Sequence, residues 1–310
     1  MEDSHFALAH LGGDWADTAA FAVFDGHGGR EVACFCQQRL PVVIGKQPRA
    51  RPTAALRKAF ESMDELLRVP EEQSFLRSFT GTTRGGNTLR EAGRVGCTAV
   101  VCLVQSKQLV VANAGDSRVV LSRGGVAIPL SEDHKPNLPA ERVRIQRAGG
   151  NVDRQQIGNF IQYRVNGNLN LSRTIGDLDY KRNLSLPMSE QLISSTPDVM
   201  LFDRTEDDEF LLLACDGIWE AISSQDAVDF IKERLRGVSG AKAPLSTIME
   251  ELLDHCFAPD LISSGGIGGD NMTALLVLLQ PGTCRPYPEV QSSQASQFSS
   301  SGTASWCSCR

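Results

Sequence analysis

The stretch with the clearest chemical potential lies where an apolar run ends in Asp25-Gly26-His27. The run, residues 18–24, predicts a buried strand, so Asp25 is placed where the chain leaves the core. Gly26 lets the backbone approach whatever Asp25 binds, and the two glycines after His27 permit a tight turn into a helix. A carboxylate, a bare carbonyl and an imidazole together can hold a hard cation and move a proton. Asp-Gly is also common turn chemistry, so this stretch alone leaves both interpretations open.

Carboxylates occur at three further places, two of them beside strongly apolar runs. Glu2-Asp3 opens the chain, Asp216 follows one apolar run, and Asp270-Asn271 precedes another. A carboxylate beside a buried strand lies near the edge of the core, where an unpaired charge is costly. Several of them converging on one edge would repel each other unless a cation lay between them. Oxygen ligands without His or Cys favour Mg²⁺ or Mn²⁺ over zinc, but spacing alone does not show whether these groups converge.

The apolar patterns predict a mixture of helices and strands that must position these groups. Strands are expected over 4–11, 18–24, 96–104, 108–114, 118–122, 126–130, 209–214 and 272–279, and helices over 30–40, 53–68, 139–149, 225–235 and 245–257. The four strands between 96 and 130 predict one antiparallel meander. The first helix is expected to end before Pro41, and Thr53 is a candidate cap for the second. Residues 70–94 are polar and predict a long flexible insertion.

Composition narrows the class of protein. The chain has 310 residues, 41% of them hydrophobic, and a net charge of −6, which argues against a nucleic-acid or membrane surface. It has no apolar run of the roughly 18 residues needed to span a bilayer and no signal peptide at its start. The nine cysteines are irregularly spaced without a paired metal pattern, which favours a reducing cytosol, with a nuclear location also compatible. We expect a monomer.

Seven short motifs occur in a fixed order along residues 1 to 280, and together they resemble the metal-dependent protein serine/threonine phosphatases of type 2C. One Asp-Gly-His-Gly-Gly would be suggestive, whereas seven ordered blocks are very hard to obtain by chance. The blocks are Met1-Glu2-Asp3, Asp25-Gly26-His27-Gly28-Gly29, Gly115-Asp116-Ser117-Arg118, Asp133-His134-Lys135-Pro136, Leu171-Ser172-Arg173-Thr174-Ile175-Gly176-Asp177, Asp216-Gly217-Ile218-Trp219-Glu220 and Gly269-Asp270-Asn271-Met272-Thr273.

The resemblance implies an α+β fold, a four-layer α-β-β-α sandwich in which two stacked antiparallel sheets are flanked by helices. The phosphatase domain is expected over residues 1–280. Residues 281–310, rich in Ser, Gln and Gly, are expected to form a disordered tail. The family's metal ions lie in a cleft at one end of the sandwich.

The resemblance also assigns roles to residues of this chain. Two Mg²⁺ or Mn²⁺ ions are implied, with a weaker third. Asp25 bridges the two, the other ligands being Glu2 and the carbonyl of Gly26 for one ion and Asp216 and Asp270 for the other. Asp116 matches the third site and shares Asp216 with it, while Glu220 stands where many members have Asp. Asp3 and Asn271 fit roles in orienting bound waters and ligand carboxylates, and His27 is assigned as the general acid.

Some motif residues have an alternative, structural interpretation. A hairpin turn with a local Asp116–Arg118 pair would explain the Gly-Asp-Ser-Arg block without an ion, and both interpretations stay open. Three further acidic residues are read as local scaffold, namely Asp133, Asp177 and Asp179. Arg173 is read as structural or substrate-facing rather than catalytic.

The implied reaction is hydrolysis of phosphoserine and phosphothreonine in phosphoproteins, by a hydroxide bridging two divalent ions and without a phosphoenzyme. One departure from the family pattern concerns the start. Members usually carry an upstream strand with an arginine that binds the substrate phosphate, whereas this sequence begins at Met1. We therefore expect the domain's first strand to be missing and activity or stability to be lowered. A phosphatase-like binding or regulatory module with little turnover is the alternative, and a small-molecule phosphatase would use the same core chemistry.

Overall fold

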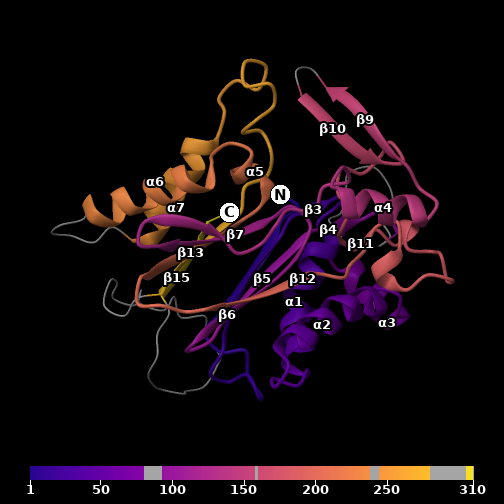
Figure 1. Ribbon diagram of the computed structural model, residues 1–310, viewed down its shortest axis with the longest axis horizontal. Coiled ribbons are helices and arrows are strands. Elements are labelled where there is room, and N and C mark those ends of the chain that lie inside the picture. Colours follow the sequence, from indigo (N-terminus) through magenta and orange to yellow (C-terminus); the bar gives the residue numbers. More distant parts are fainter. Residues whose placement is uncertain (80–92, 158–159, 238–243, 280–304, 310) are drawn as a thin grey trace.

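Antiparallel strands and helices follow each other along the chain in the order shown in Figure 1. The computed structural model describes residues 1–79, 93–157, 160–237, 244–279 and 305–309. The helices are α1 (Glu31–Gly45), α2 (Pro52–Leu66), α3 (Pro70–Arg77), α4 (Pro139–Arg147), α5 (Asp216–Trp219), α6 (Ser224–Gly237) and α7 (Leu245–Cys256), with short 3₁₀ turns at Leu178–Tyr180 and Met188–Glu190. The strands are β1 (Ser4–Leu8), β2 (Ala19–Phe24), β3 (Gly26–His27), β4 (Gly96–Cys97), β5 (Ala99–Val104), β6 (Gln108–Ala114), β7 (Arg118–Arg123), β8 (Val126–Pro129), β9 (Val152–Ile157), β10 (Phe160–Val165), β11 (Ile175–Gly176), β12 (Asp198–Asp203), β13 (Asp208–Ala214), β14 (Ala274–Leu278) and β15 (Ser305–Cys309).

Two five-stranded antiparallel sheets form the centre of the fold. The first has the order β1-β2-β5-β6-β12 and the second the order β15-β14-β13-β7-β8. A three-stranded sheet, β11-β4-β3, and the hairpin of β9 and β10 complete the strand pairing of the described residues. Figure 1 shows this hairpin beside α4, away from the two large sheets.

The two large sheets pack face to face because side chains alternate along each strand. Phe21 and Val23 of β2 share one buried cluster with Leu211 and Leu213 of β13. The residues between them in sequence point the opposite way. Thus Ala20 and Ala22 belong to a second cluster with α1 and α2, whereas Leu212 belongs to a third cluster with α6 and α7.

The helices therefore cover the outer faces of the two sheets, and Figure 1 shows α1–α3 and α6–α7 on opposite sides of the strands. This arrangement confirms the predicted α+β class. Within the described ranges, no helix combines the length and the apolar character that a membrane crossing requires.

Two predicted helix boundaries are wrong, and burial explains the first. Helix α1 continues through Pro41 to Gly45, although a proline inside a helix costs about 3 kcal/mol. The residues after the proline bring Ile44, which is fully buried, into the core beside α2. Tertiary packing therefore outweighs the local penalty. At the second helix Thr53 is not the cap, because α2 starts with Pro52 at its first position, where the missing N–H has no intrahelical partner to lose.

The predicted meander and insertion also need correction. The chain leaves the first sheet after β6 and enters the second sheet at β7, so the four strands between 96 and 130 are divided between two sheets. The predicted strand 96–104 is interrupted at Thr98, between β4 and β5. The first third of the expected insertion is helix α3, and residues 80–92 lie outside the described residues.

The C-terminal segment departs from the prediction of a disordered tail where it is described. Ser305–Cys309 forms β15, which pairs antiparallel with β14. The remainder of the predicted tail, residues 281–304 and 310, lies outside the described residues.

A buried ion pair fixes the segment that connects β11 to the 3₁₀ turn at Leu178–Tyr180. Lys181 donates to Asp64 of α2 over 2.6 Å, and both side chains are fully buried. Asp64 also accepts the N–H of Gly176 at 2.8 Å, while Lys181 donates to the carbonyl of Thr174 at 2.7 Å. One carboxylate and one ammonium thus hold both ends of residues 174–181 against α2.

We predict that Lys181→Met lowers the free energy of unfolding by about 3–5 kcal/mol, because it leaves the Asp64 carboxylate buried without its counter-charge. Chemical denaturation measures the effect. Lys58→Met, on α2 with Asp64, is the matched control. The ion pair of Lys58 with Glu65 is exposed, and we expect a loss below about 1 kcal/mol. Equal losses in the two variants would contradict the prediction.

Candidate metal centre and catalytic residues

Three carboxylates meet at the ends of strands from both large sheets. Asp25 follows β2, Asp116 lies in the crossover from β6 to β7, and Asp216 follows β13 by two residues and begins α5. One carboxylate oxygen from each lies within 4.8 Å of the others. At that separation and an effective dielectric constant near 20, each pair of charges repels by roughly 3–4 kcal/mol. The sequence predicted these side chains individually, and the fold brings them together.

Burial and mutual repulsion shift the protonation of this cluster. Burial raises the pKa of Asp25 well above its ordinary value, and the charges of Asp216, Asp3 and Asp116 raise it further. Burial and the Asp116 charge likewise raise the pKa of Asp216, to about 7, although Lys135 acts in the opposite direction. The carboxylates therefore carry an energetic cost when they are ionised, which a bound cation would offset.

The hairpin interpretation of Asp116 is wrong. The residues around it cross between sheets, and Arg118 pairs with Asp133 at 2.9–3.0 Å rather than with Asp116. Asp116 is instead bonded to Lys135 through Oδ2. Burial lowers the pKa of Lys135, but the Asp116 carboxylate outweighs this effect and raises it above the ordinary value. Asp133, by contrast, has the scaffold role predicted for it.

The first residues of the chain lie against the segment before β14 and against Gly26, next to the cluster residue Asp25. The backbone N–H of Glu2 donates to Oδ1 of Asn271 at 2.7 Å, and Asp3 Oδ2 accepts from the hydroxyl of Thr273 at 2.8 Å. A Cβ at Gly26 would lie 2.2 Å from the carbonyl oxygen of Glu2, so only glycine allows this approach. The structure therefore brings together Glu2, Asp3, Gly26 and Asn271, as the motif order implied.

The two remaining predicted ligands border this region. Asp270 is exposed and caps its own turn, with Oδ1 accepting from the N–H of Asn271 at 2.7 Å. Its charge raises the pKa of both Asp3 and Glu220, after the larger effect of burial in each. The pKa of Glu220, the residue after α5, is also raised by Asp116 and lowered by Lys135. Neither belongs to the close cluster, but both lie within electrostatic reach of it.

His27 is held by a partner that sequence reasoning read as scaffold. Its Nε2 lies 2.7 Å from Oδ2 of Asp177, whose carboxylate also accepts the hydroxyl of Thr174 at 2.7 Å. A Cβ at Gly96 would lie 2.2 Å from Asp177 Oδ2 and 2.8 Å from His27 Nε2, so this glycine makes room for the pair. Burial lowers the pKa of His27, but Asp177 outweighs burial, and the net shift is upward.

The donor set fits a divalent cation. Asp3 and Asp116 each have a buried Oδ1 atom with no hydrogen-bond partner among the described residues. Buried polar atoms are almost always paired, so such atoms beside repelling carboxylates point toward a cation and its waters. The ligands available are all oxygens, which suits a hard divalent ion.

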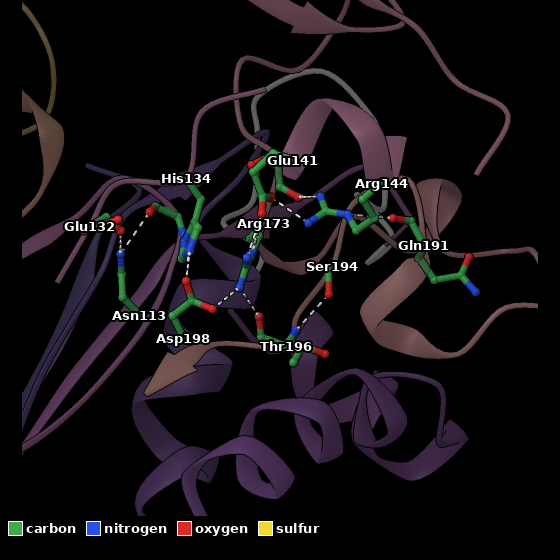
Figure 2. A network of polar contacts seen from close by, with 12 residues as sticks. Asn113, Glu132, His134, Glu141, Arg144, Arg173, Gln191, Ser194, Thr196 and Asp198 are labelled. Atoms are coloured by element: carbon green, nitrogen blue, oxygen red, sulfur yellow. Dashed lines mark hydrogen bonds and ion pairs between the residues drawn. The ribbon is translucent and has the colours of Figure 1, made fainter. Parts of the chain in front are cut away.

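Arg173 has a structural role in the described contacts. It donates to Glu141 at 2.6 and 3.1 Å and to Asp198 at 2.8 Å, and it lies within the polar network of Figure 2. Asp179 pairs with the exposed Arg94 at 3.4 Å and with Arg182. These contacts agree with the structural interpretation of Arg173 and with the scaffold interpretation of Asp179.

A mixed α+β domain with an acidic oxygen cluster and an adjacent His–Asp pair has the groups that a metal-dependent hydrolase requires. Comparison with known proteins specifies the family. The family model described as "Protein phosphatase 2C" matches residues 1–264. "Probable protein phosphatase 2C 11" of Oryza sativa subsp. japonica is 41% identical over 310 residues, covering 89% of this chain and 81% of that protein. "Protein phosphatase 2C homolog 2" of Schizosaccharomyces pombe is 42% identical over 284 residues, covering 89% and 69%.

A solved structure supports the fold. The crystal structure of a phosphatase from Toxoplasma gondii superposes with a TM-score of 0.68 at 24% identity, covering 89% of this chain and 87% of that one. The chain belongs to the protein phosphatase 2C family and is a protein serine/threonine phosphatase, whose family chemistry is metal-dependent dephosphorylation of proteins.

Two functional contacts escaped prediction from the sequence. Lys135 lies within the Asp133-His134-Lys135-Pro136 motif, but nothing in the neighbouring sequence indicates a bond to Asp116, 19 residues away. Asp177 likewise ends a quoted motif, yet 150 residues separate it from His27. The only available signal for either contact was that Lys135 and Asp177 lie within motif blocks.

We predict that the metal-free protein becomes less stable as pH rises from about 4 through about 7, relative to Asp216→Asn. The sign follows because a carboxyl with a raised folded-state pKa binds its proton more tightly when folded. The free-energy cost of ionising Asp216 in the folded protein is absent below its unfolded-state pKa. It grows as the pH rises toward its folded-state pKa. At pH 7.5 in EDTA, Asp216→Asn should be more stable than the wild type by about 1–3 kcal/mol.

Thermal denaturation across pH, with EDTA or Mn²⁺, measures this difference, and Mn²⁺ should reverse the order of the two proteins. Asp229→Asn on the exposed face of α6 is the control, with no pH-dependent difference expected. A gap between wild type and Asp216→Asn that does not change with pH would contradict the prediction.

Proposed function

We propose that this chain hydrolyses phosphoserine and phosphothreonine in proteins by direct attack of hydroxide, without a phosphoenzyme. The observation that carries the proposal is the cluster of Asp25, Asp116 and Asp216 beside the His27–Asp177 pair. Two Mg²⁺ or Mn²⁺ ions bound there would offset the charge of the phosphate dianion and supply, from a water bridging them, hydroxide near neutral pH.

The proposed ligands divide between two faces of the site. Asp25 follows β2 of one sheet and would bridge the two ions, while Asp216 enters from the other sheet. Glu2 and the Gly26 carbonyl would complete one side, and Asp216 and Asp270 the other. Asp116, sharing Asp216, would hold a third ion, and Glu220 would be a further carboxylate ligand beside them. Asp3 and Asn271 would orient these ligands through the contacts to Thr273 and to the Glu2 N–H.

His27 is proposed as the general acid, since the alkoxide of serine or threonine leaves poorly unless it is protonated. Its Nε2 bonds Asp177, so the ring orientation is fixed before substrate binds. The Asp177 carboxylate also favours the protonated imidazole, which is the form that can donate a proton. Asp177 sits at φ 50° and is anchored by Thr174 and by its own N–H to the carbonyl of Val95 at 3.0 Å.

A reducing cytosolic or nuclear location and a monomeric state stay predictions. The six described cysteines assigned as free are all buried thiols, which supports a reducing compartment.

We predict that Asp25→Asn lowers phosphate release from a phosphothreonine peptide with Mn²⁺ by at least about 10³-fold, because the substitution removes one of the three carboxylate charges that would hold the metal ions. Malachite-green detection of free phosphate measures turnover. EDTA should abolish the wild-type activity and Mn²⁺ should restore it. Asp229→Asn is again the control and should keep full activity. Substantial turnover by Asp25→Asn, or in EDTA, would refute the metal mechanism.

We predict that Asp177→Asn affects substrates according to their leaving group. Turnover of the phosphothreonine peptide should fall by about 10–100-fold, whereas turnover of para-nitrophenyl phosphate should change less than about threefold, because nitrophenolate leaves without a proton. Asn is tolerated at positive φ, so the backbone is retained. Steady-state kcat on both substrates measures the effect, with His27→Ala for comparison. Equal losses on the two substrates would indicate a structural role for Asp177.

A further inference from the structure

A second polar depression lies between α2 and α4, built from residues that the catalytic proposal does not use. Its volume is about 310 Å³. Helix α4 contributes Ala140, Val143 and Arg147 at spacings of three and four residues, which places them on one face. Arg57 of α2 and the segment Ser194–Asp198 complete its walls. We refer to this depression as the arginine groove.

The floor of the arginine groove is held by a buried network whose charges are already paired. Arg144 donates to Glu141 at 2.6 Å and to backbone carbonyls of Gln191 and Ser172. Arg173 bridges Glu141 and Asp198, as Figure 2 shows. The guanidinium groups drive the pKa of Glu141 down to about 2 against the opposing effect of burial. These side chains form a rigid floor and have little capacity left for a ligand.

Asp198 at the edge of the floor is also neutralised. Its Oδ2 lies 3.1 Å from Nε2 of His134, whose Nδ1 accepts the N–H of Gly115. Nε2 therefore carries a proton that it donates to Asp198. Together with the bond from Arg173, this contact lowers the pKa of Asp198 and keeps it ionised but paired.

Arg57 and Arg147 differ from the floor arginines. Both side chains are exposed, and neither guanidinium group forms an ion pair or hydrogen bond with any residue in the described ranges. They belong to different helices and face one depression. The lining has four arginines against three acids, of which Glu141 and Asp198 are paired and Glu190 interacts favourably with Arg144. The groove thus offers two free cations on a chain whose net charge is −6.

We propose that the arginine groove binds carboxylate side chains of an acidic segment in the phosphoprotein substrate, at a distance from the phosphorylated residue. Arg57 and Arg147 form the charge contacts, and Ala140 and Val143, the latter 46% exposed, contact the aliphatic parts of the segment. The proposal rests on the proposed function, because the segment belongs to its substrate. Contacts so placed attract the substrate without touching the reacting atoms, so they act on KM rather than kcat.

Direct binding tests the groove without requiring catalysis. Fluorescence anisotropy of rhodamine-labelled hexaglutamate is measured with the full chain in EDTA, so that no bound cation attracts the probe to the Asp cluster. The wild type should bind hexaglutamate more tightly than hexaglutamine, and Arg57→Glu/Arg147→Glu should weaken the binding about tenfold. Arg142→Glu is the matched control, since Arg142 is exposed on α4 but does not line the groove, and it should change binding less than about threefold.

Turnover supplies the second readout. For phosphothreonine peptides with and without a glutamate-rich extension, the double variant should raise KM about fivefold to tenfold for the extended peptide only, with kcat and para-nitrophenyl phosphate turnover unchanged. Equal hexaglutamate binding by wild type and double variant, or an equal loss in Arg142→Glu, overturns the proposal. So does strong competition by millimolar inorganic phosphate, which would indicate a small-anion site. Loss of turnover in every sample with hexaglutamate binding intact would instead refute the proposed function.

Discussion

The repulsion among Asp25, Asp116 and Asp216 is the constraint on which the rest of the site depends. Three carboxylates within 4.8 Å of one another destabilise the chain that holds them, so the surrounding structure must be stable enough to keep them there. The two packed sheets supply that stability. Because β2 and β13 bury every side chain near their ends, the residues that follow cannot move apart without breaking the core.

The protein treats its carboxylates in two opposite ways, and the difference separates scaffold from site. Glu141, Asp177 and Asp198 each have a guanidinium, an imidazole or both within hydrogen-bond distance, and the pKa of each is lowered. Asp25 and Asp216 face other carboxylates, and their pKa values are raised. Lys135 offsets the negative charge of only one member of the cluster, Asp116. Incomplete compensation is what leaves the cluster able to attract a cation, whereas full pairing makes the other groups rigid.

The sequence predicted the parts of the site that depend on the ends of strands. Asp25 and Asp216 directly follow apolar runs, and such runs become central strands whatever their surroundings. Glu2 and Asn271 precede β1 and β14, which belong to different sheets, and the packing of the two sheets brings them together. Local patterns failed where partners are distant. Arg118 is the nearest cation to Asp116 in sequence, but the crossover between sheets turns it toward Asp133, and Lys135 takes its place.

The helix through Pro41 and the Asp177–His27 contact share one cause with that failure: each is decided by packing rather than by local preference. Proline disfavours the helix interior by an amount that burial of Ile44 and packing of Val43 can offset. Asp177 adopts a positive φ that disfavours most residues, and it does so because Asp64 and Lys181 fix the neighbouring backbone. The ion pair between Asp64 of α2 and Lys181 thereby determines where the Asp177 carboxylate lies. Through Asp177 it also determines the orientation of His27. The orientation of the imidazole thus depends on a buried charge pair that is not part of the acidic cluster.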